Sequence, residues 1–210
     1  MTTGSTRRRR TRSDGERSHR AILDAATRLA TTEGLDGISI ARVASEIGMS
    51  KSGLFSHFAS KQELQMATIE AAEAIYAAEV VEPALERPEG RERLEALCAR
   101  YLSYVERGVF PGGCFFAATA AEWDTRPGPV RDRLRAVLAG WSEVMEANVR
   151  AAQDQGTLPA EADAARLVFE LNALLHEANG HFLLFRDPVA LEHARAAIAD
   201  RLGAVRAPAR

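Results

Sequence analysis

The stretch that most constrains the fold runs from Ser39 to Leu64, SIARVASEIGMSKSGLFSHFASKQEL. It predicts two short helices joined by a tight turn, followed by the start of a third helix. Ser39 can cap the first helix because its hydroxyl accepts a hydrogen bond from a backbone N–H that has no helical partner. Gly48 suits the left-handed residue that ends this helix. This layout is that of a helix-turn-helix, whose second helix lies in the major groove of DNA.

The second helix of the pair has a small, polar and cationic face. Its apolar positions are Leu54, Phe55 and Phe58, and Gly53 adds no bulk. The polar face argues against the alternative, an ordinary helical hairpin inside a bundle. Ser60 and Glu63 form a capping box that opens the third helix. The polar face consists of Ser50, Lys51, Ser52, Ser56 and His57.

In these positions the sequence resembles the TetR family of bacterial transcriptional regulators, over roughly residues 18 to 70. The family pattern is a Ser or Thr cap, a glycine turn, a Ser-Lys helix start, an aromatic-x-His-Phe end and a following Lys. One position departs from it: the family has Tyr where this chain has Phe55, and Phe cannot hydrogen-bond a phosphate. The matching residues are Ser39, Gly48, Ser50-Lys51, Phe55-Ser56-His57-Phe58 and Lys61.

The expected DNA contacts fall into two groups. Base edges are reached from the start of the second helix, at Ser50, Lys51, Ser52 and Gly53, and the Phe55 ring packs beside them. The resemblance implies phosphate contacts from Ser39, His57 and Lys61. Arg42 is either a further phosphate contact or part of a solvated helix face.

The charge of the chain is divided unevenly. Residues 1–61 hold 11 Lys+Arg and 6 Asp+Glu, a net of +5, and the remainder holds 16 and 23, a net of −7. A basic head neutralises phosphates, while an acidic body does not adhere to DNA. We expect three parts: a disordered Arg-rich arm at 1–17, a DNA-binding domain at 18–64, and an effector-binding and dimerisation domain at 65–205.

The fold class is predicted to be all-α, with about nine helices, because no strand-like alternation appears. The first helix spans 18–32, and three such helices make the head. A long helix then runs from 62 to 82 without a linker, and Pro83 stops it. The remaining body helices are expected at 91–107, 114–122, 130–153, 161–185 and 188–203.

The last two helices, 161–185 and 188–203, form a hairpin that is apolar on more than one side. The resemblance implies that this hairpin pairs with a second copy in a four-helix homodimer interface. The alternative is a thick monomer core. A two-fold dimer suits a symmetric operator, and this favours the dimer.

The resemblance also implies a pocket for a small-molecule effector in the body. Asn172, His176 and Asn179 form a polar line on an apolar helix, so each must be satisfied by a neighbouring helix, water, ligand or dimer partner. The candidate ligand-binding residues are Tyr101, Phe115, Phe116, Trp123, Trp141, Met145, Asn172 and His176.

Cysteine and histidine usage predicts no metal site, no cofactor and no disulfide framework. Cys98 lies on an apolar stripe and is predicted to be an unreactive residue of the core. Cys114 begins a helix, where the helix N-terminus favours a lowered thiol pKa. No apolar run approaches the ~18 residues of a membrane span, and no export signal follows the Arg run, so we expect a cytoplasmic protein.

These features favour a ligand-responsive transcriptional regulator, a repressor that leaves a palindromic operator when a small molecule binds. A redox-sensing regulator acting through Cys114 is the first alternative. A helical enzyme is the second, although no nucleophile elbow, phosphate loop, metal set or paired carboxylates are present. A sequence-nonspecific architectural DNA protein is the third, and the acidic body argues against it. The sequence leaves the operator and the effector open.

Overall fold

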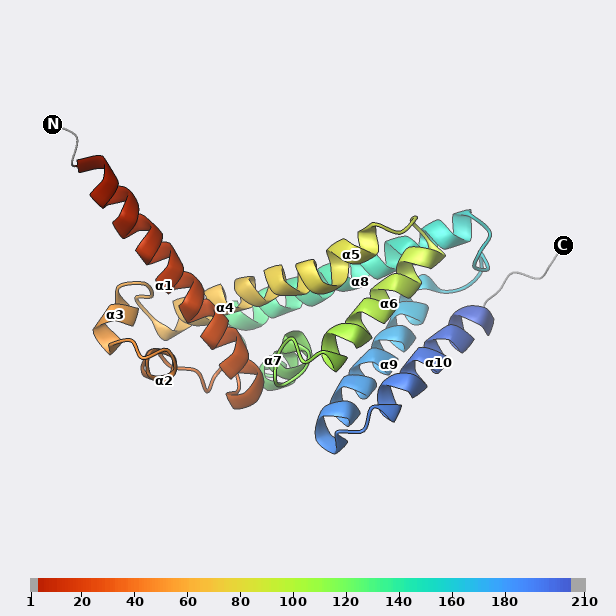
Figure 1. The fold of residues 1–210 in the computed structure, drawn as a ribbon. Helices are drawn as coiled ribbons and strands as arrows, with labels where there is room; N and C mark the ends of the chain where they lie inside the picture. Colours follow the sequence, from red (N-terminus) through yellow and green to blue (C-terminus); the bar gives the residue numbers. More distant parts are fainter. Residues whose placement is uncertain (1–3, 205–210) are drawn as a thin grey trace.

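The computed structural model describes residues 4–204, with side chains from 15 to 203, and this range contains helices and no strand (Figure 1). With α4, η1 and α5 counted as one continuous helix, the described residues form nine helices, which confirms the all-α prediction. The elements are α1 (Gly4–Glu33), α2 (Ile40–Glu46), α3 (Lys51–Phe55), α4 (Lys61–Tyr76), η1 (Ala77–Val81), α5 (Glu82–Leu85), α6 (Arg91–Glu106), α7 (Phe115–Trp123), α8 (Pro129–Asp154), α9 (Ala164–Phe185) and α10 (Val189–Ala204).

The head consists of the C-terminal half of α1 with α2, α3 and the start of α4. α1 packs on α2 and α4, and α2 packs on α3. Each of these four helices contributes large apolar side chains to one small core, and none of them could bury its apolar face alone. Fully buried side chains of this core are Ile22, Leu35, Ile38, Val43, Leu54 and Leu64.

Local capping sets the boundaries of the head helices, as the sequence predicts. Gly48 adopts φ +65 in the turn between α2 and α3, a conformation that favours glycine. Three serine hydroxyls each accept a hydrogen bond from the N–H three residues later, at 3.0 to 3.1 Å: Ser39 from Arg42, Ser50 from Gly53 and Ser60 from Glu63.

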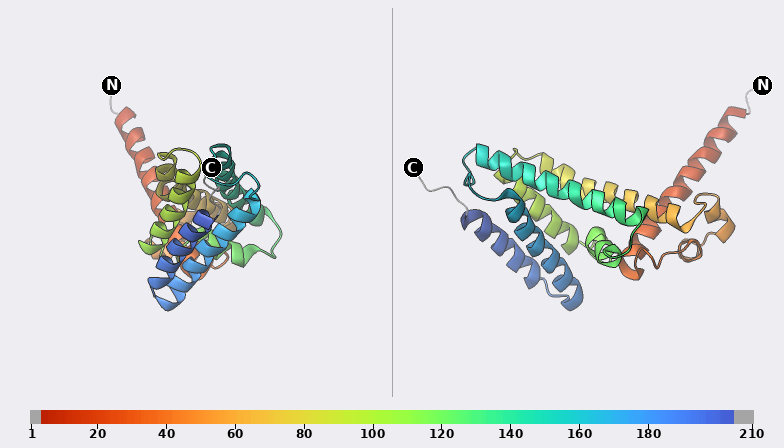
Figure 2. Two further views of the ribbon diagram at one scale, coloured as in Figure 1. Left: turned by 90° about the vertical axis from the view of Figure 1, so that its right-hand side faces the viewer. Right: turned by 180° about the vertical axis from the view of Figure 1, so that it is seen from behind.

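The N-terminal arm is corrected by the structure. α1 begins at Gly4, where the sequence predicts a disordered arm over 1–17 and a helix from Ser18. Residues 4–17 contain no proline, and Arg and Glu favour the helical state. The helix therefore extends backwards from the turn that Ile22 anchors in the core. Figures 1 and 2 show this end of α1 projecting away from the rest of the molecule; residues 1–3 lie outside the described range.

In the body, α4, η1 and α5 lie along α8, and α9 and α10 form an antiparallel hairpin that contacts α6 (Figures 1 and 2). α7 lies where the body meets the head and contacts both α1 and α8. Within residues 4–204, no helix is both long and apolar enough to cross a membrane.

Pro83 does not stop the long helix, which is a second correction. The helix continues through α5 to Leu85 because η1 is a π turn, in which the N–H of Glu82 bonds to the carbonyl of Ala77. The wider turn leaves room for the proline ring and removes the need for its missing N–H.

Candidate nucleic-acid interface and body cavity

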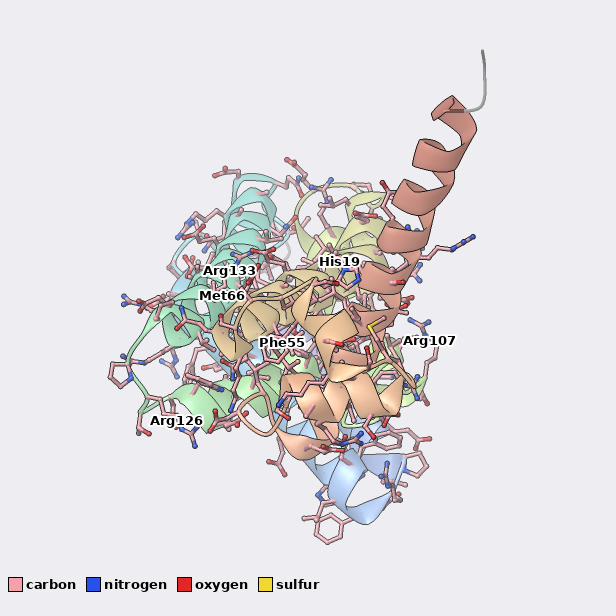
Figure 3. All side chains as sticks on the ribbon, turned by 90° about the vertical axis from the view of Figure 1, so that its left-hand side faces the viewer. His19, Phe55, Met66, Arg107, Arg126 and Arg133 are labelled. Atoms are coloured by element: carbon pink, nitrogen blue, oxygen red, sulfur yellow. The ribbon has the colours of Figure 1, made fainter. Side chains whose placement is uncertain are left out.

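The outer face of α3 is built as the sequence predicts. Leu54 is buried and anchors the helix, while Lys51 and Ser52 are exposed. Phe55 is 46% exposed, and the Lys51 ammonium lies 5.8 Å from the centre of its ring. Figure 3 looks onto the head from its outer end, with Phe55 on the side that faces the viewer. An exposed cation, hydroxyl and aromatic ring on one short helix suit contact with a polyanion.

Gly53 has a packing role in addition to its small size. A Cβ at this position would lie 3.1 Å from both Met49 Cγ and Ser50 Oγ. Its N–H is the group that the Ser50 hydroxyl caps. Glycine therefore keeps the start of α3 close to the preceding turn.

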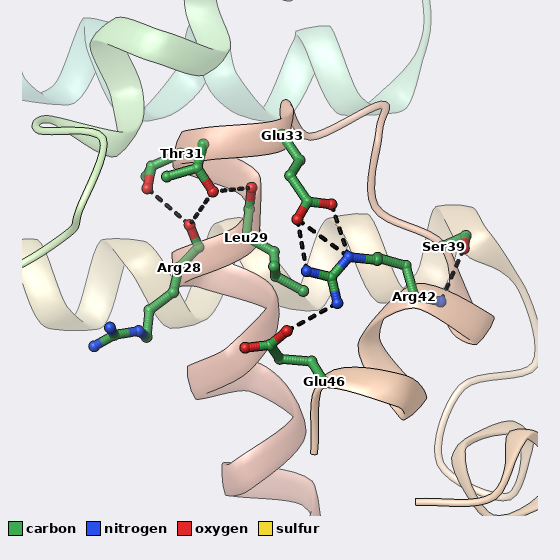
Figure 4. A network of polar contacts seen from close by, with 8 residues as sticks. Arg28, Leu29, Thr31, Glu33, Ser39, Arg42 and Glu46 are labelled. Carbon is green, nitrogen blue, oxygen red and sulfur yellow. Dashed lines mark hydrogen bonds and ion pairs between the residues drawn. The ribbon is translucent and has the colours of Figure 1, made fainter. Parts of the chain in front are cut away.

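Arg42 is held by two carboxylates within the head. Its guanidinium donates to Glu33 Oε1 at 2.6 Å and Oε2 at 2.9 Å, and to Glu46 Oε2 at 2.8 Å (Figure 4). These hydrogen bonds raise the pKa of Arg42 further above its usual range. The two carboxylates engage all three nitrogens of the guanidinium, so a phosphate at Arg42 would compete with them.

Lys61 is engaged in a similar way. Its ammonium donates to the carbonyl of Asp36 at 2.5 Å and to its carboxylate at 2.8 Å. Arg126, from the body, donates to the same carboxylate at 2.8 Å. The hydrogen bonds from Lys61 and then Arg126 lower the pKa of Asp36. Asp36 and Arg126 were missed at the sequence level because no local pattern reports pairings across 25 and 90 residues.

His57 lies beside a second histidine that the sequence does not single out. Its ring centre is 5.9 Å from that of His19, which stacks on Phe58 at 5.0 Å. α1 therefore packs against the residues that follow α3. Figure 3 shows His19 at the surface of the head.

The loop between α1 and α2 is held by α7. The Glu122 carboxylate accepts hydrogen bonds from the backbone N–H groups of Leu35 at 2.7 Å and Asp36 at 2.8 Å. On the other side, Gly112 N–H donates to the hydroxyl of Thr31 at 3.2 Å, and a Cβ at Gly112 would lie 1.9 Å from the Thr31 carbonyl oxygen. The head is thus joined to the body at α7 as well as through α4.

A small cavity lies at the centre of the body, with a volume of about 20 Å³. Four of the eight predicted ligand residues meet here: Tyr101, Phe116, Trp141 and His176. Tyr76, which no sequence pattern indicates, lies among them. It contacts four rings edge-on or nearly so, with 5.5 to 6.5 Å between ring centres. The remaining lining residues are Cys114, Val137 and Leu138.

The other predicted ligand residues take different positions. Phe115 and Met145 are fully buried and belong to the wall of neither the small central cavity nor the larger cavities beside α8. Trp123 lines a separate cavity of about 450 Å³ between α7 and α8. Asn172 accepts a hydrogen bond from Trp141 Nε1 at 2.9 Å. These side chains share the apolar character of cavity residues, but helix rotation decides which of them reach the cavity.

Two of the three residues in the polar line on α9 are hydrogen-bonded within the chain. Asn172 bonds to α8 as described, and Asn179 Oδ1 accepts from the N–H of Cys114 at 2.9 Å. The His176 ring lies 6.5 Å from that of Tyr101, and burial lowers the pKa of His176. His176 itself is exposed, so water can reach its ring nitrogens.

Both thiols are buried. Burial raises the pKa of Cys98 to about 12 and also raises the pKa of Cys114. The prediction of a lowered pKa at Cys114 is therefore wrong: desolvation outweighs the N–H groups at the start of α7. A redox sensor based on a reactive Cys114 thiolate loses its physical basis. Among the described side chains, no three His, Cys, Asp or Glu residues are grouped as a metal would require.

Helix α9 of the C-terminal hairpin carries three strongly exposed apolar side chains. Phe169 is 74% exposed, Leu184 76% and Phe185 62%. A shallow cavity of about 370 Å³ lies between α9 and α10 and is lined by residues that include Leu174, Ala178 and Val189. Exposed apolar patches are typical of interaction surfaces.

Comparisons with known proteins agree with this architecture. The profile described as "Bacterial regulatory proteins, tetR family" matches residues 22–67, and the profile "Tetracyclin repressor-like, C-terminal domain" matches residues 90–198, more than half of the chain. No curated protein sequence matches this chain.

Several solved structures have the same fold. A TetR transcriptional regulator from Chloroflexus aurantiacus is 26% identical, with a TM-score of 0.81 over 91% of this chain and 96% of that one. AibR in complex with isovaleryl coenzyme A and operator DNA is 22% identical, with a TM-score of 0.70 over 91% and 99%. A putative transcriptional regulator from Saccharomonospora viridis in complex with choline is 23% identical, with a TM-score of 0.72 over 90% and 96%. Because both family profiles match, one of them over more than half of the chain's length, the chain belongs to the TetR family of bacterial transcriptional regulators.

Proposed function

We propose that this chain is a homodimeric repressor that binds a palindromic DNA operator and leaves it when a small molecule binds in the body. The observation that carries the proposal is the exposed face of α3, where Lys51 and Ser52 lie beside the helix start that Ser50 caps. The head that holds α3 is hydrogen-bonded to the body through Glu122. The protein then acts in the cytoplasm, where the DNA is.

The DNA contacts are proposed in two groups. Ser50, Lys51, Ser52 and Gly53 face the bases from the start of α3, with Phe55 packing against the sugar-phosphate edge. Ser39 and His57 contact phosphates. Lys61 contacts a phosphate when its hydrogen bond to Asp36 is replaced by one to the phosphate. Arg42 lies on the solvated face of the head and makes no direct contact.

The dimer is proposed to form through α9 and α10. Exposed Phe169, Leu184 and Phe185 give the hairpin an apolar outer face that a second copy would cover. Two-fold pairing places two α3 helices on one side of the dimer, as a palindrome requires.

Effector release is proposed to act through α7. This helix begins at the small cavity, where Cys114 and Phe116 form part of the wall, and ends near Glu122, which holds the α1–α2 loop. A ligand that moves α7 would change the position of the head and hence the spacing of the two α3 helices. Such a ligand must bind the two states with different affinities.

Titration of the purified protein against its upstream DNA and against shuffled DNA tests the proposal. Lys51→Ala should weaken operator binding and reduce the slope of log K against log salt by about 1, because one phosphate or base contact is lost. Arg42→Ala is the matched control, since Arg42 is already paired, and it should have a smaller effect. Equal affinity for both DNAs would instead indicate an architectural protein.

A further inference from the structure

Two cavities in the body share one wall. The cavity of about 20 Å³ beside Tyr101 and a second cavity of about 280 Å³ between α4–η1 and α8 are both lined by Tyr76, Val137 and Trp141. Movement of the Tyr76 or Trp141 ring would join them. A cavity of about 150 Å³ is enough for a benzene ring, so the joined space suits a molecule of one or two rings.

The inner end of this space has an unsatisfied donor. The Tyr101 hydroxyl is buried and has no hydrogen-bond partner among the described residues. The neighbouring Cys114 thiol is at most a weak partner. A buried hydroxyl without a partner costs free energy, and such groups in native proteins usually have a specific reason. Here an oxygen acceptor on a bound molecule would supply the missing bond.

The charges around the space exclude an anionic ligand. Among the residues that line the two cavities, Glu73 is the one carboxylate, and it is paired with Arg133. Burial favours the neutral form of His176. With no lysine or arginine in either wall, a buried carboxylate or phosphate would lack a counter-charge.

The wall also disfavours a quaternary ammonium. Tyr76 meets its neighbouring rings edge-on, with Tyr104, Phe116 and Trp141 at interplanar angles above 80°. In each such pair the edge of one ring covers a face of the other, so these faces are closed to a cation, which needs a ring face. A permanent cation would also leave the Tyr101 hydroxyl without an acceptor.

We propose that the effector is a neutral, flat, mainly apolar molecule with a carbonyl or hydroxyl oxygen that accepts a hydrogen bond from Tyr101. It lies between α4–η1 and α8 and separates Tyr76 from Trp141. This inference rests on the proposed function for the existence of an effector, and it adds the chemical class.

The test measures direct binding, independently of DNA. The chain has two tryptophans, so Trp141 is the single tryptophan of a Trp123→Phe protein. Its fluorescence, excited at a wavelength that tyrosine does not absorb, is titrated with four probes of similar size. The probes are acetophenone, ethylbenzene, benzoate and phenyltrimethylammonium. Acetophenone should bind about 5- to 10-fold more tightly than ethylbenzene, the value of one hydrogen bond, and the two ions should bind least.

Tyr101→Phe should remove the advantage of acetophenone over ethylbenzene. Tyr104→Phe is the matched control: its hydroxyl already accepts from the N–H of Phe115 at 3.4 Å, so the preference should remain. The melting temperature gives a second readout. Tyr101→Phe should not lower it, because an unsatisfied group is removed, whereas Tyr104→Phe should lower it.

Tighter binding of benzoate or phenyltrimethylammonium would overturn the proposed class. So would equal binding of acetophenone and ethylbenzene, or no binding of either neutral probe by a protein that still binds its operator. If acetophenone binds as expected but the protein stays on its operator, the proposed effector class is supported and the proposed release from DNA is wrong.

Discussion

At the scale of single residues, the acidic side chains around the head decide which cations are available to DNA. Asp36 binds Lys61 and Arg126, and Glu33 and Glu46 together hold Arg42. These pairs are solvent-exposed, so each contributes little to stability. We expect their main effect to be on DNA recognition, because a phosphate competes with a carboxylate already in place at Lys61 and Arg42. Among the described side chains, the Lys51 ammonium instead lies over the Phe55 ring.

The two thiols give a prediction at this scale. Because burial raises the pKa of both Cys98 and Cys114, the thiolate fraction at pH 8 is lower than for a free cysteine, and access is also restricted. We expect neither thiol to react with Ellman's reagent at pH 8 in the native protein, and both to react in guanidinium chloride. Rapid reaction of one thiol in the native protein would restore the redox-sensing alternative.

At the scale of elements, α7 connects three parts of the molecule. Its N-terminus contacts the aromatic cavity, the helix packs beside α8, and its C-terminal turn holds the α1–α2 loop through Glu122. α4 is the other connection, since it runs from the capping box at Ser60 into the body. α4 connects head and body as one continuous helix, whereas α7 connects them through hydrogen bonds to the α1–α2 loop. We therefore expect an effector to break the connection at α7 and not the one at α4.

Glu122→Gln tests the role of α7. An amide has one oxygen where the carboxylate has two, so one of the two backbone N–H groups of the loop loses its acceptor. We expect a loss of roughly 1–2 kcal/mol in the free energy of unfolding, measured in urea, together with weaker effector release at retained operator binding. Glu86→Gln removes the same charge from an exposed position on the far side of the body and should change neither quantity.

At the scale of the whole molecule, the proposed function makes operator binding depend on the pairing of two chains. In the proposed dimer each head reads one half of a palindrome, and the two α3 helices must lie about 34 Å apart, one turn of DNA. The apolar outer face of α9 is where the second copy is expected. Affinity for the operator therefore falls with anything that separates the chains, even if each head stays folded.

Leu184→Glu should separate the dimer, because it would place a charge inside an apolar interface. Light scattering after gel filtration should show a monomer with an unchanged circular dichroism spectrum, and operator affinity should fall by at least about 100-fold, or roughly 3 kcal/mol. Leu85→Glu is the control, since Leu85 is similarly apolar and exposed but lies on α5. A Leu184→Glu protein that remains dimeric would place the interface elsewhere.

The sequence by itself determined what depends on neighbours three or four residues apart. The caps at Ser39, Ser50 and Ser60, the turn at Gly48 and the apolar spacing of each helix are local signals, and local hydrogen bonds formed as they predict. The recognition motif is local as well, so the family and the outer face of α3 could be predicted without a structure.

Only the tertiary structure decided the rest, because these features depend on groups brought together by packing. The bonds of Glu122 to the loop cross 86 and 87 residues, and the pairing of Lys61 with Asp36 crosses 25. The cavity depends on which side chains each helix turns inwards, so Tyr76 entered it while Phe115 and Met145 did not. At Cys114 the local and tertiary effects oppose each other: a helix start favours the thiolate, but full burial costs more, and the pKa rises.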